Sequence, residues 1–386
     1  MQGQAMTTRP RHLWMDVARG LCSLMICAGH LRGAMFLDYS QLAERHWWDT
    51  LFYALTGQGR QLVMVFYVLS GFFIGGSVLQ RWQGFRFDEY LMARLTRLMV
   101  VLLPALMITV AVDSVHRQLN PGLFEGRDFA ALSSGPMEGG NYSLSWRTLL
   151  LNLLFLQNLA GPVYGSNGPL WTLGNEFWFY LSFPLGVHAC NRNRSLPSRL
   201  CFALLALLIS MLVLRQIWAG FVIWLLGVAV HLAYQSHWVK GSPTLCWVAL
   251  ALQLASVACA DVLYRNPSFW NAADILSGFS SALLLVALKE VEPKRIKGAL
   301  AIGFRWLAEM SFTLYLVHFP LVLLTFTVFF RKGQQRLSAV SLAWYLLHLT
   351  ILLVISRLLW HLFERRTPGV RAWLRRRLQR LGLLQG

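Results

Sequence analysis

The sequence predicts an all-α membrane protein with about ten transmembrane helices. Hydrophobic residues make up 56% of the 386 residues, and the mean hydropathy is positive at +0.49. Apolar stretches recur along almost the whole chain, and about ten of them reach the roughly 20 residues that a transmembrane helix requires. Basic residues stand in short segments between these stretches, as cytoplasmic loops do. We therefore expect a multi-pass protein of the bacterial inner (plasma) membrane.

The charge pattern predicts an orientation and excludes a nucleic-acid partner. The formal net charge is +18, but the Lys and Arg residues alternate with apolar runs instead of gathering in one soluble region. Arg9 and Arg11 precede the first apolar stretch, which lacks a signal-peptide cleavage site and is therefore expected to be retained. The C-terminal segment is rich in arginine and is expected to lie against anionic lipid headgroups. Both termini are thus predicted to be cytoplasmic.

The predicted organisation is a single transmembrane domain between two short tails. We expect a cytoplasmic N-terminal tail (1–12), a transmembrane domain (13–363) and a basic cytoplasmic tail (364–386). The segment 149–159 is apolar but too short to span, so it is predicted to be re-entrant or interfacial. The expected spans are 13–36, 61–80, 91–113, 170–189, 200–214, 217–234, 245–263, 275–288, 300–329 and 337–363.

The first predicted helix carries three ionisable residues, Asp16, Arg19 and His30. Such groups are costly inside a bilayer and usually mark functional sites. Arg19 and His30 are eleven residues apart, or roughly 16 Å along a helix axis, so both can face one cavity at different depths. An imidazole suits removal of a hydroxyl proton, and a guanidinium binds phosphate or carbonyl oxygen. The structural alternative is that Asp16 and Arg19 simply pair with each other.

A basic cluster is expected at the cytoplasmic end of the third helix. Arg94 and Arg97 stand three residues apart, with Arg81 and Arg86 nearby in the sequence. Arginine clusters suit phosphates. CoA carries a phosphorylated nucleotide at one end of a long arm and a thioester at the other, so this cluster, with a base deeper in the membrane, fits acyl-CoA. Ordinary membrane topology would explain the same arginines without a ligand.

Two other predicted helices contribute polar groups at membrane depth. Glu176 lies about two turns into a helix expected to begin outside, near the depth of His30, where a carboxylate can orient an imidazole or bind a sugar hydroxyl. His318 is a second imidazole, beside Pro320. A structural contact between helices is the alternative for each. The six cysteines lack metal-type spacing, and no metal site is predicted.

Six stretches in order along the chain resemble the acyltransferase 3 family of integral membrane acyltransferases. The resemblance implies a ten-helix domain that passes an acyl group, commonly acetyl, from cytoplasmic acyl-CoA to a carbohydrate or other hydroxyl acceptor. It makes Arg19, His30, Arg94, Arg97 and Glu176 functional positions. The stretches are Met15-Asp16-Val-Ala-Arg19-Gly20 followed by His30, Phe66 to Phe72 with Ser70, Arg94-x-x-Arg97, Trp171 to Tyr180 with Glu176, Ser311 to Pro320 with His318, and Phe363-Glu364 before Pro368.

We therefore expect an acyl-CoA-dependent O-acyltransferase that has no permanently bound cofactor. In this hypothesis Arg94 and Arg97 hold the CoA phosphates, Arg19 steadies the acyl group, and His30, assisted by Glu176, deprotonates the acceptor hydroxyl. An acyl-histidine intermediate at His30 is an alternative route. Further candidate substrate-binding or structural positions are Asp16, Ser70, Trp171 and His318.

Two other classes of function stay open at this stage. A transporter or flippase of lipid-linked sugars would also line a cavity with buried charges, and dependence on acyl-CoA distinguishes it from an enzyme. A scaffold of an envelope-polysaccharide complex is the third class, because a fold does not determine a function. The sequence shows no esterase-like domain after the last helix, so a separate soluble partner that relays the acyl group is also left open.

Overall fold

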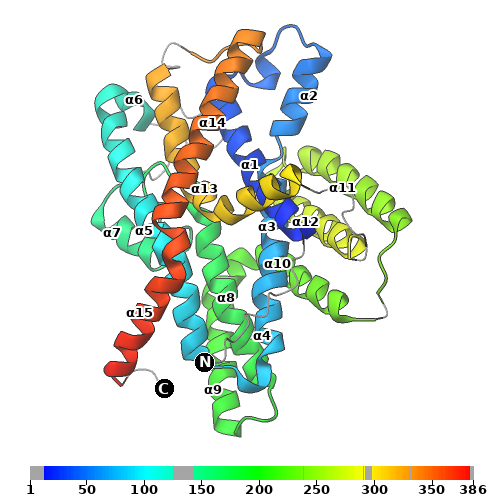
Figure 1. Ribbon diagram of the computed structural model, residues 1–386, viewed down its shortest axis with the longest axis vertical. Helices are drawn as coiled ribbons and strands as arrows, with labels where there is room; N and C mark the ends of the chain where they lie inside the picture. Colours follow the sequence, from blue (N-terminus) through cyan, green and yellow to red (C-terminus); the bar gives the residue numbers. More distant parts are fainter. Residues whose placement is uncertain are drawn as a thin grey trace.

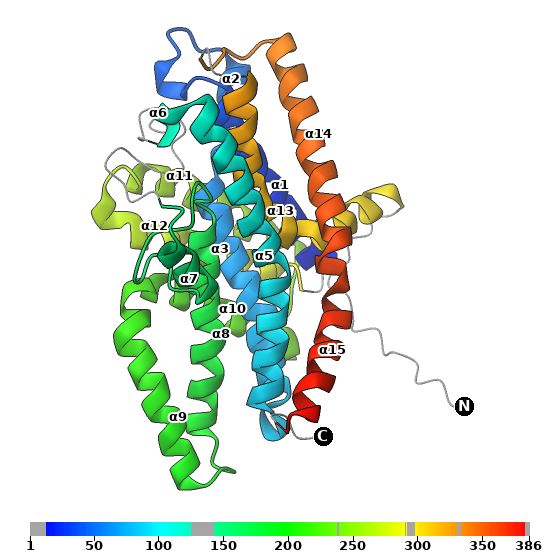
Figure 2. The same cartoon turned by 90° about the vertical axis from the view of Figure 1, so that its left-hand side faces the viewer.

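The computed structural model describes residues 13–124, 143–237, 239–289, 291, 298–329 and 333–382. Over these ranges the chain forms helices and loops, with three isolated β-bridges and no β-strand, which confirms the predicted all-α class. The predicted tail 1–12 lies outside the described residues. Figures 1 and 2 both place α2 at one end of the molecule and α15, with the C-terminus, at the other. We refer to these as the α2 end and the α15 end.

The helices follow the predicted apolar stretches closely. The α-helices are α1 (Leu13–Met35), α2 (Trp47–Thr56), α3 (Gly59–Ser70), α4 (Gly76–Gln80), α5 (Phe87–Leu119), α6 (Pro121–Phe124), α7 (Trp146–Leu153), α8 (Leu170–Cys190), α9 (Leu196–Ile209), α10 (Arg215–Gln235), α11 (Pro243–Leu263), α12 (Trp270–Ala287), α13 (Ala299–Phe329), α14 (Ala339–Leu362) and α15 (Thr367–Arg380). π-Helical turns at Gly71–Gly75 and Ser210–Leu214 join α3 to α4 and α9 to α10. Two of the predicted spans are therefore interrupted helices.

Seven helical segments of the described chain are long and apolar enough to cross a membrane, so the protein is a multi-pass membrane protein. Residues 200–214 and 217–234, predicted as two spans, belong to one segment that is bent at Ile217 (φ −124°, ψ 22°). α1, which carries Asp16 and Arg19, and α8, which carries Glu176, are outside the seven. The count of ten and the cytoplasmic side of the termini stay predictions.

α7 begins the segment that was predicted to be re-entrant or interfacial. The helix has only eight residues, about 12 Å at 1.5 Å per residue, which is too short to span a bilayer. The loop after it folds back against the bundle. The Asn152 amide donates to the Pro162 carbonyl (3.1 Å) and accepts from the Tyr164 N–H (3.1 Å), and Gln157 donates to the Leu170 carbonyl. Polar backbone groups of this irregular segment are thus bonded to protein groups.

Two glycines bring α10 against the α3–α4 segment at van der Waals distance. A Cβ atom on Gly71 would lie 1.9 Å from the Trp224 carbonyl oxygen, and one on Gly227 would lie 2.0 Å from the Val68 carbonyl oxygen. Neither position therefore has room for a side chain. The small residues act in close helix contact. The contact supports the turn that follows Ser70.

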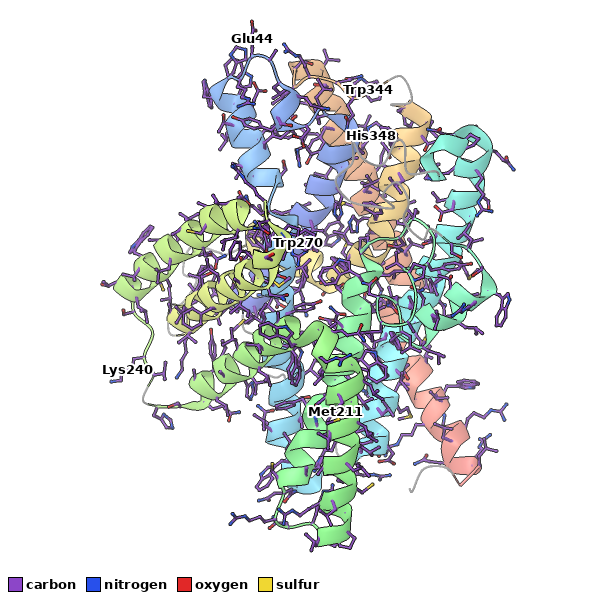
Figure 3. The ribbon with its side chains drawn as sticks, turned by 180° about the vertical axis from the view of Figure 1, so that it is seen from behind. Glu44, Met211, Lys240, Trp270, Trp344 and His348 are labelled. Carbon is purple, nitrogen blue, oxygen red and sulfur yellow. The ribbon has the colours of Figure 1, made fainter. Side chains whose placement is uncertain are left out.

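α11 and α12 form a pair at the side of the bundle. α11 packs against α12, and α12 packs against α3 and α10. Figures 1 and 3 both show this pair projecting from the main bundle, with Lys240 in the loop before α11 and Trp270 at the start of α12. α1, in contrast, packs along α13, and α13 also contacts α5 and α14. The polar groups that were singled out in α1, α3, α5, α8 and α13 therefore belong to the main bundle.

The predicted basic tail 364–386 begins as ordered structure. Glu364 is buried (2% exposed) in a 3₁₀ turn, Glu364–Arg366, and α15 follows and packs against α5. Arg375 of α15 pairs with Glu89 of α5 at 2.7 Å. The arginines that were expected to meet lipid headgroups thus include some that face another helix.

Candidate active site

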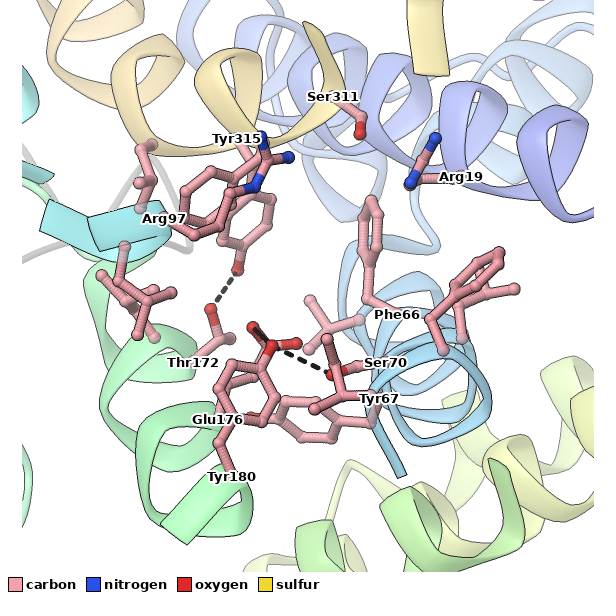
Figure 4. A pocket seen from close by; sticks show the side chains of 18 of the residues that line it. Arg19, Phe66, Tyr67, Ser70, Arg97, Thr172, Glu176, Tyr180, Ser311 and Tyr315 are labelled. Atoms are coloured by element: carbon pink, nitrogen blue, oxygen red, sulfur yellow. Dashed lines mark hydrogen bonds between the residues drawn. The ribbon is translucent and has the colours of Figure 1, made fainter. Parts of the chain in front are cut away.

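An inner cavity of about 290 Å³ lies between α1, α3, α5, α8 and α13. Its apolar wall includes Phe66, Phe73 and Leu98. Figure 4 shows the polar side chains directed into it from the surrounding helices. The sequence-predicted residues Arg19, Ser70, Arg94, Arg97 and Glu176 all line this one space, together with Thr172, Tyr180, Ser311 and Tyr315.

Glu176 stands at the end of a chain of hydrogen bonds. The Trp224 indole donates to the Ser70 hydroxyl oxygen (3.1 Å), the Ser70 and Tyr180 hydroxyl groups are 3.0 Å apart, and the Tyr180 hydroxyl donates to a Glu176 carboxylate oxygen (2.9 Å). Because the carboxylate only accepts, Tyr180 directs its proton towards Glu176 and accepts from Ser70. The carboxylate is held at the cavity wall by a donor whose own position is fixed.

Ser70 owes its position to the π-helical turn that follows it. The turn Gly71–Gly75 inserts an extra residue into the α3–α4 segment, and such turns are frequent at functional sites because they redirect side chains. Here the Ser70 hydroxyl meets both Trp224 of α10 and Tyr180 of α8. The sequence identified Ser70 within a glycine-bearing stretch. It did not predict the π-helical turn or the contact of that turn with α10.

Arg19 combines the two roles that the sequence left open. Its guanidinium donates to the Asp16 carboxylate at 2.9 Å, as the structural alternative expected. The same side chain lines the inner cavity and lies over the Phe73 ring, 5.9 Å from the ring centroid. The ion pair with Asp16 therefore holds Arg19 in the cavity wall.

A second space, the basic cavity, adjoins the inner cavity towards the α15 end. It measures about 530 Å³ and shares Phe73, Ile74 and Arg94 with the inner cavity. Glu89 is the one carboxylate among its described lining residues. The arginines that line it come from the connection between α4 and α5, from α5 and from α15. They are Arg81, Arg86, Arg94, Arg371 and Arg375. Such a concentration of guanidinium groups favours a ligand with several negative charges.

Arg94 and Arg97 stand in different environments, although they were predicted as one cluster. Arg97 is paired with the buried Glu364 at 2.6 Å. Arg94 has no ion-pair partner in the described part of the chain, its Nε is buried without a hydrogen bond, and its guanidinium lies 5.7 Å from the Tyr90 ring centroid. Arg94, where the two cavities meet, therefore has an unused donor.

His30 and His318 form a pair of their own, outside the lining of the inner cavity. The His30 Nδ1 and His318 Nε2 atoms are 2.8 Å apart. Tyr315, which lines the inner cavity, contacts the His318 ring (centroids 5.9 Å apart). The predicted assistance of His30 by Glu176 is not seen, since Glu176 bonds to Tyr180 while His30 bonds to His318.

Trp171 supports the cavity from behind. Its ring meets the Tyr67 ring edge-on (centroids 6.4 Å apart), and Tyr67 lines the cavity and accepts a hydrogen bond from the Asn175 amide (3.2 Å). Trp171 itself is not a lining residue. Its position fits a structural role in the same stretch that presents Glu176.

Several site residues were missed in the sequence. Tyr180 was quoted only as the end of a stretch, although its spacing of four from Glu176 predicts a contact on one helix face. Arg371 and Arg375 also stand four apart, on α15, but a basic tail gives no sign of which arginines turn inward. No cluster of three or more His, Cys, Asp or Glu that could hold a metal ion occurs within the residues that the structure describes.

The fold and the site together define a multi-pass helical membrane protein with a charged internal cavity that continues into a basic one. The chain belongs to the acyltransferase 3 family, because the model for this acyltransferase domain (Acyl_transf_3) matches residues 12–339. Acyltransferase MdmB of Streptomyces mycarofaciens is 26% identical over 338 residues, which cover 79% of this chain and 77% of that protein. No solved structure matches the chain. The protein is therefore a membrane acyltransferase by family.

Proposed function

We propose that the protein transfers an acyl group, most simply acetyl, from cytoplasmic acyl-CoA to a hydroxyl group of an extracytoplasmic carbohydrate. The α15 end is then cytoplasmic, and the protein lies in a bacterial inner membrane. The comparisons name acyltransferases and lend no support to the transporter alternative. The donor, the acceptor and the membrane are parts of this proposal.

The observation that carries the proposal is the junction of the two cavities at Arg94. Acyl-CoA has phosphates at one end and a thioester at the end of a long, thin arm. The basic cavity offers Arg81, Arg94 and Arg371 to phosphates, and the inner cavity beyond Arg94 has aromatic walls and a small volume. A molecule with a charged end and a slender arm matches both spaces in this order.

In the proposed reaction, the acceptor hydroxyl gives its proton to His30 as its oxygen attacks the thioester carbonyl. The new C–O bond forms, the C–S bond breaks, and CoA leaves as the thiolate, which takes up the proton from His30. Arg19, in the wall of the inner cavity, contacts the acyl arm behind the thioester. Glu176, fixed by Tyr180, binds the pantetheine arm or the acceptor.

Tyr315 stands between the inner cavity and His30 in this mechanism. Its ring contacts the Phe66 ring (centroids 5.8 Å apart) and the His318 ring (centroids 5.9 Å apart). In this mechanism the thioester passes Tyr315 before it meets His30. We propose that the Phe66–Tyr315 contact opens when the acyl arm is bound.

The test is transfer of radiolabelled acetyl from acetyl-CoA to carbohydrate in sealed membrane vesicles. Inside-out vesicles expose the cytoplasmic face to acetyl-CoA, and right-side-out vesicles do not. We expect label in the carbohydrate fraction of inside-out vesicles alone, and no label with His30→Ala. Removal of a general base typically lowers a rate by about 10²- to 10⁴-fold.

The outcomes separate the candidate functions. Label in right-side-out vesicles alone would reverse the orientation. If wild-type vesicles of both kinds incorporate no label while lipid-linked sugars cross the membrane, the flippase alternative replaces the proposal. Purified protein in lipid nanodiscs, with no other component, decides whether a soluble relay partner is required.

A further inference from the structure

The two imidazole rings of His30 and His318 meet edge to edge. Their planes differ by only 5°, their centroids are 5.0 Å apart, and the nearest nitrogens are 2.8 Å apart. A separation of 2.8 Å is shorter than a van der Waals contact between stacked faces and matches an N–H···N hydrogen bond between parallel rings. The pair therefore shares one proton between His30 Nδ1 and His318 Nε2.

The surroundings of His318 decide where that proton resides. His318 Nδ1 lies 3.0 Å from the Leu314 carbonyl oxygen and 2.9 Å from the Tyr315 carbonyl oxygen. Carbonyl oxygens only accept hydrogen bonds, so His318 Nδ1 must carry a proton. In a neutral imidazole, the other nitrogen then has no proton. His318 Nε2 is thus the acceptor, and His30 Nδ1 is the donor.

Both rings are neutral in this arrangement. His318 is fully buried, and no carboxylate contacts either ring among the described residues. Arg32 acts on His30 with a positive charge. A buried imidazolium without a counter-ion would be unfavourable. Since His30 Nδ1 holds the proton, His30 Nε2 is the unprotonated nitrogen, and it forms no hydrogen bond within the described chain.

We propose that His318 is a positioning residue that fixes the Nδ1–H tautomer of His30 and so presents His30 Nε2 as the base or nucleophile for acyl transfer. This inference rests on the proposed function for its consequence, but the tautomer itself does not depend on it. His30 is partly exposed while His318 is buried, so only His30 is open to a substrate. His318 fixes the tautomer and orientation of His30, as a hydrogen-bonded orienting group does for a catalytic histidine in general.

The first test reads the tautomer directly and needs no enzyme activity. The ¹⁵N NMR spectrum of protein labelled in its histidine rings separates protonated from unprotonated ring nitrogens, and subtraction of the His30→Gln spectrum assigns His30. We expect a protonated Nδ1 and an unprotonated Nε2 in the wild type. In His318→Leu we expect this preference to be lost. A wild-type His30 with its proton on Nε2 would overturn the proposal, and so would an unchanged His30 signal in His318→Leu.

The second test separates positioning from folding. His318→Gln keeps an acceptor, its amide oxygen, close to His30 Nδ1, whereas His318→Leu supplies none. We expect His318→Leu to lower kcat at least about tenfold, to leave the KM for acetyl-CoA within about twofold, and to be partly rescued in His318→Gln. Equal activity of all three proteins would overturn the proposal, and so would equal loss in Gln and Leu variants that still bind acetyl-CoA. If the wild type transfers no acetyl group at all, the proposed function fails while the NMR test still decides the tautomer.

Discussion

Arg97 of α5 and Glu364, just before α15, form an ion pair at 2.6 Å that joins the wall of the inner cavity to the C-terminal helix. The other carboxylate oxygen of Glu364 accepts hydrogen bonds from the backbone N–H (3.1 Å) and the hydroxyl group of Thr313 on α13. One buried carboxylate therefore connects α5, α13 and the turn that leads to α15. The position of Arg97 in the cavity depends on a residue that the sequence had assigned to a tail.

We expect Glu364→Ala to destabilise the protein by about 1.5–3 kcal/mol. Loss of one partner costs about 3–5 kcal/mol when a pair is fully buried, and the value is reduced here because the Arg97 side chain is 42% exposed. Thermal unfolding in detergent measures the change. The control is Glu309→Ala, which removes a half-exposed partner of Arg357 and should cost at most about 1 kcal/mol. Equal shifts in the two variants would contradict the connecting role of Glu364.

Arg94→Ala should weaken CoA binding more than replacement of an exposed arginine of α15 does. One charge-assisted hydrogen bond contributes about 1.5–3 kcal/mol, which corresponds to about 10- to 150-fold in Kd. Calorimetry with CoA at fixed ionic strength measures the affinity of protein in nanodiscs. Arg376→Ala is the matched control, since Arg376 is exposed and lines neither cavity. Equal affinities for wild type and Arg94→Ala would remove Arg94 from the donor site.

The sequence predicted the helices well because their signals are local. Apolar length and basic loops locate a span without knowledge of its neighbours, so α1, α8 and α13 end within a few residues of expectation. The motif residues Arg19, Ser70 and Glu176 were also predicted to be functional, and the structure places them around one cavity. Whether they act in catalysis stays a prediction.

The partners of these residues could not be predicted, because they depend on helix packing. His30 was matched with Glu176 on depth alone, yet depth does not say which helix a side chain faces, and α1 packs along α13, which carries His318. The same limit applies to Glu364 and to the arginines of α15, where the sequence shows charge but not direction. The sequence predicts which residues share one face of a helix, but it does not predict which residues meet between helices.

Gly227→Ala should disrupt the contact that supports Ser70. The added Cβ would lie 2.0 Å from the Val68 carbonyl oxygen, so backbone would have to move. We expect a loss of about 1–3 kcal/mol in stability, as overpacked interiors show, and a parallel loss of acetyl transfer. Gly186→Ala is the control, because nothing lies within 4 Å of its added Cβ. Comparable melting temperatures for both variants would show that α10 does not need the close approach.

Glu176→Gln should lower kcat strongly, and Tyr180→Phe should reproduce part of the loss. Tyr180 joins Ser70 to the Glu176 carboxylate through hydrogen bonds of 3.0 and 2.9 Å, so its hydroxyl sets the position of that carboxylate. A hydrogen bond to a charged group contributes about 1.5–3 kcal/mol. We therefore expect Tyr180→Phe to lower kcat by about 10-fold or more. The measurement is the initial rate of label transfer in inside-out vesicles, corrected for the amount of protein.

The matched control is Tyr234→Phe, because the Tyr234 hydroxyl bonds to the Leu285 carbonyl oxygen (2.9 Å) and the residue lines neither cavity. This variant should retain near-wild-type transfer. The double variant Glu176→Gln/Tyr180→Phe distinguishes a shared role from two separate ones. If Tyr180 acts only by positioning Glu176, the double variant is no slower than Glu176→Gln alone, since residues in one hydrogen-bonded network are not additive. A loss equal to the product of the two single losses would mean that Tyr180 meets the substrate independently.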